Sequence, residues 1–125
     1  MVPLLCQEYL PRMTVPSHPW ASVIVPIKDE RDNLVPLTEQ LLKALESCDE
    51  SRSAPFEILF IDDGSSDGSW DAVARLAGQN PHVHGFRFRR NFGKAAALAA
   101  GFASARGDTI LTLDADLQED RKSVV

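Results

Sequence analysis

Apolar residues follow two different periods along this chain, one typical of buried strands and the other typical of helices. Four short runs rich in β-branched and aromatic residues predict strands at 22–27, 56–61, 83–88 and 109–113. Because the first two runs are apolar at nearly every position, they favour strands that are buried on both faces of a parallel sheet.

Three helical patterns separate these strands. Leucines spaced by three and four predict a helix from about Asn33, the expected N-cap, to Ser47. A stripe that starts at Trp70 predicts a second helix ending near Gly78, and an alanine-rich run predicts a third at 94–105. The order βαβαβαβ predicts an α/β fold of three layers (α/β/α), with a mainly parallel sheet and right-handed crossovers.

The length of the chain, 125 residues, allows one domain of this kind. Prolines at positions 3, 11, 16 and 19 interrupt any regular period near the start of the chain. We therefore expect 1–20 to be an irregular N-terminal leader and 21–125 to form the folded part.

The balance of charges argues against a protein that binds nucleic acid through its phosphates. The chain has 13 Lys and Arg residues against 18 Asp and Glu residues, a formal net charge of −5. Two cysteines, Cys6 and Cys48, are too few for a zinc site or a disulfide framework, which favours a reducing compartment. The sequence has neither a signal-peptide pattern nor an apolar run that could span a membrane, so we expect a cytoplasmic protein, either soluble or at the cytoplasmic face of a membrane.

Polar side chains follow all four predicted strands at the point where each one ends. The clusters are 28–30, Asp62 with Asp63, 89–91, and Asp114 with Asp116. Ligands of open α/β sheets bind at the carboxyl ends of the strands, so we expect these clusters to converge on one edge of the sheet.

Asp114 and Asp116 are separated by one residue directly after the fourth predicted strand. In an extended backbone both carboxylates reach the same side, and such a pair suits Mg²⁺ or Mn²⁺ together with diphosphate oxygens and water. Gln118 can add a carbonyl oxygen. The alternative for an isolated Asp-x-Asp is a solvated turn, but the second acidic cluster, at Asp62 and Asp63, favours a binding site because neighbouring carboxylates repel each other unless a cation or donor groups neutralise them.

Asp63 is suited to accept hydrogen bonds from a nucleobase or a ribose hydroxyl, as carboxylates after the second strand do in dinucleotide-binding folds. The alternative is an Asx turn in which Ser66 or Asp67 caps the next helix, and for Asp67 we favour this structural role. The chain lacks both the Gly-x-Gly-x-x-Gly sequence after the first strand and a Gly-Lys-Ser/Thr phosphate loop, which excludes the usual nicotinamide and ATPase sites.

Two further groups of residues are weaker candidates. His82 and His84 lie two residues apart with no third ligand nearby in the sequence, so we expect surface residues and not a metal site. The basic cluster of arginines and a lysine at 87–94 is expected to be a solvated strand end, with Arg90 or Lys94 available to pair with a diphosphate.

Five motifs occur in order along the chain. They are Val25-Pro26-x-x-x-Glu30, Glu57-Ile58-x-x-Ile61-Asp62-Asp63-Gly64-Ser65-x-Asp67, Arg90-Asn91-Phe92-Gly93-Lys94, Ala105-x-Gly107-Asp108 and Asp114-Ala115-Asp116-Leu117-Gln118. Together they resemble the family 2 glycosyltransferases of GT-A fold, across residues 22–119. Within that family the sequence is most similar to the polyprenyl-phosphate sugar transferases, whose lipid is dolichyl or undecaprenyl phosphate.

The resemblance implies an enzyme that transfers a sugar from a UDP- or GDP-sugar to an acceptor, with a polyprenyl phosphate as the expected acceptor and inversion at the sugar carbon. It assigns the nucleotide pocket to Pro26, Glu30, Asp62, Asp63 and Asp114, and the Mg²⁺ or Mn²⁺ ion to Asp114, Asp116 and Gln118. Such a cation neutralises the charge that develops on the leaving diphosphate. No catalytic base is assigned, because an anionic lipid phosphate does not require one.

The chain departs from the family pattern in two places. The family usually has an aromatic residue and Asn at the positions of Lys28 and Asp29, on the side of the nucleotide pocket where the nucleobase of the donor stacks. The chain also ends soon after the last motif, so we interpret it as the N-terminal, donor-binding part of a truncated transferase domain. Two alternatives stay open: a non-catalytic module that binds nucleotide or a partner subunit, and, less favoured, a phosphoryl-transfer enzyme with Asp114 as nucleophile.

Overall fold

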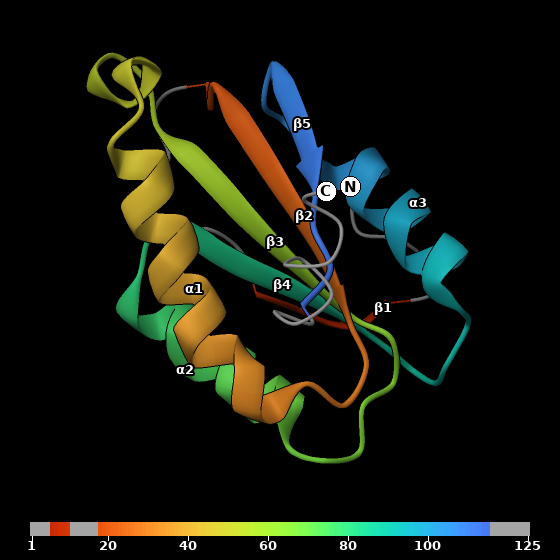
Figure 1. Ribbon diagram of the computed structural model, residues 1–125. Coiled ribbons are helices and arrows are strands. Elements are labelled where there is room, and N and C mark those ends of the chain that lie inside the picture. Colours follow the sequence, from red (N-terminus) through yellow and green to blue (C-terminus); the bar gives the residue numbers. More distant parts are fainter. Residues whose placement is uncertain (1–5, 11–17, 116–125) are drawn as a thin grey trace, which may run out of the picture.

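The computed structural model describes residues 6–10 and 18–115, which form a five-stranded sheet covered by helices on both faces. The elements in chain order are β1 (Cys6–Leu10), β2 (Ala21–Ile27), α1 (Arg31–Glu46), the short 3-10 helix η1 (Asp49–Arg52), β3 (Phe56–Asp62), α2 (Ser69–Gln79), β4 (Val83–Phe88), α3 (Lys94–Ser104) and β5 (Thr109–Thr112). Helices α1 and α2 lie on one face of the sheet and α3 on the other (Figure 1). The predicted three-layer α/β architecture is confirmed.

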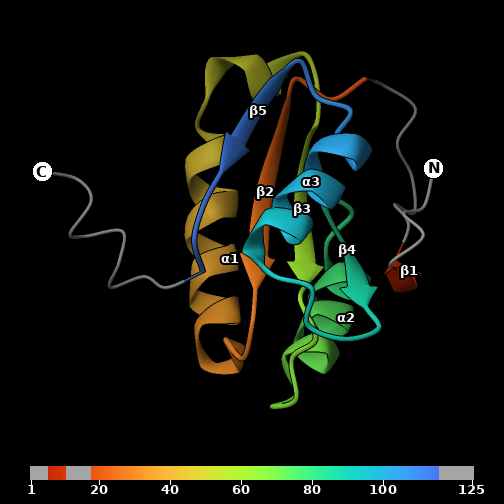
Figure 2. The same ribbon diagram turned by 90° about the vertical axis from the view of Figure 1, so that its right-hand side faces the viewer.

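The strand order is β1-β4-β3-β2-β5, and the pairs β4–β3, β3–β2 and β2–β5 are all parallel. Parallel strands in one sheet bring their carboxyl ends to the same edge. Figure 2 shows α3 crossing in front of β2 and β3, which agrees with its contacts to both strands. The loops after β2, β3, β4 and β5 therefore share one edge of the sheet, where the polar clusters at the strand ends were predicted to converge.

One segment of the expected irregular leader is a strand. Residues Cys6–Leu10 form β1, which pairs antiparallel with β4, with Cys6 opposite Phe88 and Leu10 opposite Gly85. Pro3 and Pro11 flank this run without lying in it, so proline does not interrupt its hydrogen bonds to β4. The expectation was wrong for these residues because a five-residue run shows no clear period, and its pairing depends on β4, which lies far along the chain.

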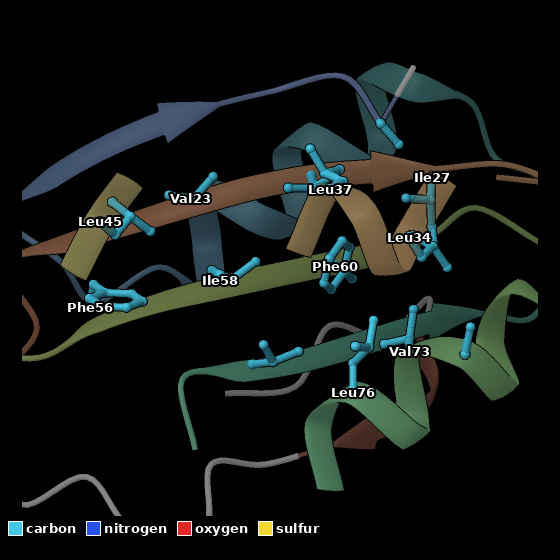
Figure 3. Close-up of a cluster of buried hydrophobic side chains, with 14 of the residues drawn as sticks. Val23, Ile27, Leu34, Leu37, Leu45, Phe56, Ile58, Phe60, Val73 and Leu76 are labelled. Atoms are coloured by element: carbon cyan, nitrogen blue, oxygen red, sulfur yellow. The ribbon is translucent and has the colours of Figure 1, made fainter. Parts of the chain in front are cut away.

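A core of apolar side chains lies between the sheet and helices α1 and α2 (Figure 3). Val23 and Ile27 of β2 point into this layer together with Phe60 of β3, and they meet Leu34 and Leu37 of α1. Successive side chains of a strand point to opposite faces, so the residues between them, such as Ile24 and Leu59, face α3 instead. The near-continuous apolar pattern of β2 and β3 thus reflects burial on both faces.

Strand β5 matches the fourth predicted strand in position but is not buried as β2 and β3 are. It lies at the edge of the sheet beyond β2, and all four of its residues are exposed, including Ile110 at 41% and Leu111 at 45%. The sequence pattern identified the strand correctly but not its exposure, because apolar residues alone do not show what lies on the outer side of a strand.

The start of α1 also differs from the expectation. The helix begins at Arg31 with Glu30 in the N-cap position, so Asn33 lies in the first turn. Asn33 instead donates a hydrogen bond from Nδ2 to Oε1 of Glu30, at 2.8 Å.

No helix among residues 6–10 and 18–115 has the length and apolar character needed to cross a membrane.

A buried polar cluster ties the amino ends of the central strands to the turn before β5. Glu57, which has no exposed surface, accepts hydrogen bonds from Ser22 Oγ, from the Arg106 N–H and from His84 Nε2. The Gly107 N–H donates to Ser22 Oγ at 2.8 Å, so the cluster fixes the backbone that leads into β5.

This cluster corrects the expectation that both histidines lie on the surface. His84 is 2% exposed because it pairs with Glu57, and the half-buried ring of His82 stacks on Phe56 at 4.0 Å between ring centroids. A polar residue in a strand is often outward-facing, but the Glu57 carboxylate from the neighbouring strand makes burial of His84 favourable.

Candidate functional site

A pocket of about 410 Å³ opens at the edge of the sheet where the parallel strands end. Its lining residues are Pro26, Ile27, Lys28, Glu30, Asp63, Lys94, Asp114 and Ala115. Four residues that the sequence placed in a nucleotide site (Pro26, Glu30, Asp63 and Asp114) therefore meet in one hollow, although they come from three different strand ends. Their roles as ligands remain predictions.

The Asp63 carboxylate holds the backbone at the start of α3. Its Oδ1 accepts the Phe92 N–H at 2.7 Å and its Oδ2 accepts the Gly93 N–H at 3.1 Å. The side chain is 5% exposed and borders the pocket. Asp63 thus positions the first turn of α3 against the pocket, and any contact with a ligand must use its remaining lone pairs.

Asp62 does not line the pocket. It is fully buried, its Oδ1 accepts the Ser65 N–H at 2.8 Å, and its Oδ2 has no hydrogen-bond partner in the described part of the chain. Burial raises the pKa of Asp62, and the hydrogen bonds from Ser65 offset this only in part. Neighbouring residues in a strand point to opposite sides, which explains why Asp63 reaches the pocket and Asp62 does not.

The loop after β2 is joined to the loop after β3 by hydrogen bonds through Asp29. Its N–H donates to Ser65 Oγ and its Oδ1 accepts the Ser66 N–H, both at 2.8 Å. The Ser66 hydrogen bond lowers the pKa of Asp29, with a further contribution from the neighbouring Lys28. Asp29 has φ of 56°, a left-handed conformation that Asp and Asn adopt more readily than most residues.

Gly64 allows the loop after β3 to lie against the loop after β4. A Cβ atom on Gly64 would lie 2.6 Å from the Asn91 nitrogen and 2.7 Å from the Arg90 carbonyl carbon, and its φ is +78°. Both the close approach and the positive φ require glycine here. The loops after β2, β3 and β4 are therefore in close contact, through the side-chain hydrogen bonds of Asp29 and Asp63 and through the close approach at Gly64.

Asp67 has a structural role, as the sequence favoured, although Gly68 and not Asp67 occupies the N-cap position of α2. Its Oδ1 accepts the Ser69 N–H at 3.0 Å at the start of α2, and its Oδ2 accepts the Arg31 N–H at 3.3 Å at the start of α1. One carboxylate thus satisfies backbone donors of two helices, which leaves Asp67 structural.

Asp114 lies after β5 with its side chain 40% exposed, and its Oδ1 accepts a hydrogen bond from the Lys94 ammonium at 2.6 Å. A carboxylate that faces the pocket and already attracts a cation suits a hard divalent metal ion. Asp116 and Gln118, the other predicted metal ligands, lie outside the described residues. Within residues 18–115 no three Asp, Glu, His or Cys side chains are grouped to hold a metal ion, so this part of the chain supplies one ligand of the predicted set.

Both lysines of the pocket lie outside the set of residues that the sequence assigned to the nucleotide and to the metal ion. Lys94 was considered only as a partner for a diphosphate, and Lys28 only as part of a strand-end cluster, yet both line the pocket. Arg90, the other basic candidate, lies over the Phe92 ring at 4.8 Å and is not among the pocket residues. One feature of the sequence indicates that Lys94 lies at the pocket: it is the first residue of a helix that directly follows a strand end.

Comparison with known proteins identifies the family of this chain. The chain belongs to glycosyl transferase family 2, whose family model matches residues 22–124. It is 38% identical over 104 residues to an undecaprenyl-phosphate 4-deoxy-4-formamido-L-arabinose transferase of Salmonella choleraesuis, a match that covers 82% of this chain. It also resembles the structure of a mannosyltransferase from Pyrobaculum calidifontis in complex with GDP-Man and Mn²⁺, at a TM-score of 0.61, 31% identity and 81% coverage of this chain.

The chain is much shorter than these relatives. The matched part corresponds to 31% of the arabinose transferase and 28% of the mannosyltransferase. Family membership speaks against the phosphoryl-transfer alternative for Asp114.

Proposed function

We propose that this chain is the donor-binding part of a glycosyltransferase that takes a sugar from a UDP- or GDP-sugar and delivers it, with inversion, to a polyprenyl phosphate. The observation that carries the proposal is the meeting of Pro26, Glu30, Asp63 and Asp114 in one pocket at the carboxyl edge of a parallel sheet. The mannosyltransferase relative binds GDP-Man and Mn²⁺, and the arabinose transferase is named for undecaprenyl phosphate, which supports the choice of donor and acceptor classes.

Different residues of the pocket suit different parts of a nucleoside diphosphate. Pro26 and Ile27 offer an apolar wall, Glu30 offers an acceptor for hydroxyl groups, and Lys94 offers a positive charge for a phosphate. Asp114, together with Asp116, would hold Mg²⁺ or Mn²⁺, which neutralises negative charge on the departing diphosphate. Hydrogen bonds of Asp29 and Asp63 join the loops after β2, β3 and β4 and position the backbone around the pocket.

The direct test is calorimetric titration of the purified chain with UDP-glucose and GDP-mannose, each with and without Mn²⁺. We expect binding of one donor that strengthens when Mn²⁺ is present, because the metal links the carboxylate to the diphosphate. The donor that binds more tightly identifies the nucleobase that the site prefers and reduces the number of candidate sugars.

The matched variants are Asp114→Asn and Glu39→Gln. Asp114→Asn keeps the size of the side chain and removes the charge, so it should abolish the Mn²⁺-dependent part of binding. Glu39 is an exposed residue of α1 outside the pocket, so Glu39→Gln should bind as the unmodified chain does. A folded chain that binds neither donor, with or without metal, would contradict the proposal.

A non-catalytic binding module is the second candidate, and the exposure of β5 favours it. Strand β5 presents Ile110 and Leu111 at the edge of the sheet, a surface that can pair with another polypeptide. The titration distinguishes the donor site from a module that binds only a partner polypeptide, since such a module would show no metal-dependent binding of a nucleotide sugar.

A further inference from the structure

Lys94 lines the donor pocket and also donates a hydrogen bond to Asp114, the predicted metal ligand. It is the first residue of α3, directly after the segment whose Phe92 and Gly93 N–H groups are held by Asp63. From there its ammonium reaches Asp114 Oδ1 at 2.6 Å. The fixed backbone at the start of α3 therefore places a flexible cation on the predicted metal ligand.

Lys94 also borders two neighbouring hollows. One is the donor pocket, and the other is a smaller hollow of about 210 Å³ lined by Pro26, Lys94, Leu98, Thr112, Leu113 and Asp114. The Lys94 side chain is 61% exposed, so its stem is free to move when the ammonium leaves Asp114. The ion pair thus lies at the boundary between the two hollows and can open without a change in the fold.

The second lysine of the pocket provides a contrast. Lys28 Nζ donates to Asp29 Oδ2 at 3.0 Å, and Asp29 is held by the loop after β3 through Ser65 and Ser66. Of these two pocket lysines, Lys94 is the one bonded to the predicted metal ligand.

We infer that Lys94 is an internal counter-ion of the donor site, which occupies Asp114 in the ligand-free protein and moves to the diphosphate when a divalent cation takes its place. The inference rests on the proposed function. The ammonium and the metal ion compete for the same carboxylate, so Lys94 weakens metal binding to the ligand-free chain. Once displaced, the same ammonium attracts phosphate oxygens, so Lys94 strengthens nucleotide binding. It thereby makes metal and nucleotide bind together more strongly than either binds alone, and this coupling acts equally in both directions.

The test is a pair of titrations on the Lys94→Met variant, which keeps most of the apolar stem and removes the charge. Mn²⁺ binding is measured without nucleotide by the loss of the free Mn²⁺ signal in electron paramagnetic resonance. Binding of UDP and of GDP is then measured by calorimetry at saturating Mn²⁺. We expect Mn²⁺ to bind the variant about twofold to fivefold more tightly, as is typical for loss of one exposed ion pair. We expect the preferred nucleoside diphosphate to bind it more weakly by a similar factor.

Lys28→Met and Lys94→Arg are the matched controls. Lys28→Met removes an ammonium from the same pocket that is not bonded to Asp114, so its effect on Mn²⁺ affinity should be smaller than that of Lys94→Met. Lys94→Arg keeps the charge and should retain most of the unmodified behaviour. Thermal melting of each variant shows that it is folded.

The outcomes distinguish this inference from the proposed function. If the unmodified chain binds Mn²⁺ and a nucleoside diphosphate but Lys94→Met leaves Mn²⁺ affinity unchanged or weakens both, the counter-ion role is wrong and the donor site stands. If the unmodified chain binds neither, the proposed function fails and this inference fails with it. Opposite changes in the two affinities are the result that a merely structural role of Lys94 would not produce.

Discussion

At the scale of single residues, Glu57 shows how this protein accommodates a buried charge. Burial alone would raise the pKa of its carboxyl group, but hydrogen bonds from His84, Ser22 and the Arg106 N–H outweigh that effect and lower the pKa to about 2 from 4.5. The folded protein therefore favours the ionised carboxylate, and this preference stabilises the fold.

The lowered pKa of Glu57 predicts the dependence of stability on acid. The stabilising contribution is complete above about pH 4.5 and is lost as the pH falls from 4.5 towards 2, because protonation then costs the folded state more than the unfolded state. Glu57→Gln should lower the free energy of unfolding by about 3 kcal/mol at neutral pH. It should also flatten the loss of stability between pH 4.5 and 2.

Urea unfolding at a series of pH values measures both effects. Glu46→Gln, at an exposed position near the end of α1, is the matched control and should change stability little. An equal acid-dependent loss of stability in Glu57→Gln and in the unmodified chain would contradict the role of this carboxylate.

At the scale of elements, the close packing of α3 on the sheet depends on small side chains. A Cβ atom on Gly101 would lie 2.4 Å from Cγ2 of Ile24 in β2, whereas a Cβ atom on Gly78 in α2 would meet nothing within 4 Å. Both glycines lie inside helices, so they share the same gain in helix propensity when replaced by Ala. They differ only in what the added methyl group contacts.

This contrast predicts opposite effects of the same substitution. Gly101→Ala should destabilise the chain by about 1–3 kcal/mol because α3 or Ile24 must shift, and Gly78→Ala should stabilise it by up to about 1 kcal/mol. Thermal unfolding followed by circular dichroism gives both values. Stabilisation by Gly101→Ala would show that α3 does not pack on β2 as closely as described here.

At the scale of the whole molecule, the sheet ends on one side in an exposed edge. Strand β5 pairs with β2, and within the described residues nothing pairs with its other side. Phe102 of α3 is also 50% exposed, in addition to Ile110 and Leu111 of β5. Apolar side chains on a free strand edge favour pairing with another chain.

We therefore expect the chain to self-associate as its concentration rises, and Ile110→Lys to reduce that association. A lysine on an edge strand opposes edge-to-edge pairing through its charge, and the exposed position of Ile110 makes its effect on stability small. Light scattering coupled to size-exclusion chromatography, over a range of concentrations, measures the change. Val35→Lys is the control, because Val35 is 46% exposed but lies on α1. An equal reduction by both variants would show that general charge, and not the β5 edge, controls association.

The sequence by itself determined the order of strands β2 to β5 with the three α-helices between them, and the edge on which the polar clusters meet. The prediction of 83–88 coincides with β4, and the predicted convergence of Pro26, Glu30, Asp63 and Asp114 is seen in the pocket. These features could be predicted because periodicity and turn residues act over a few neighbours, and because parallel strands share the direction of their ends.

Only the tertiary structure decided the pairing of β1, the exposure of β5, the burial of His84 and the contact of Lys94 with Asp114. Each of these depends on a partner far away in the sequence: β4 for β1, and Glu57 for His84. The apolar character of 109–113 could not show that β5 lies at an edge, and a lysine at a helix start could not show which carboxylate it would meet. The physical reason is that pairing and burial are set by contacts across the sheet, whereas the sequence pattern records only the preferences of each segment for its own local structure.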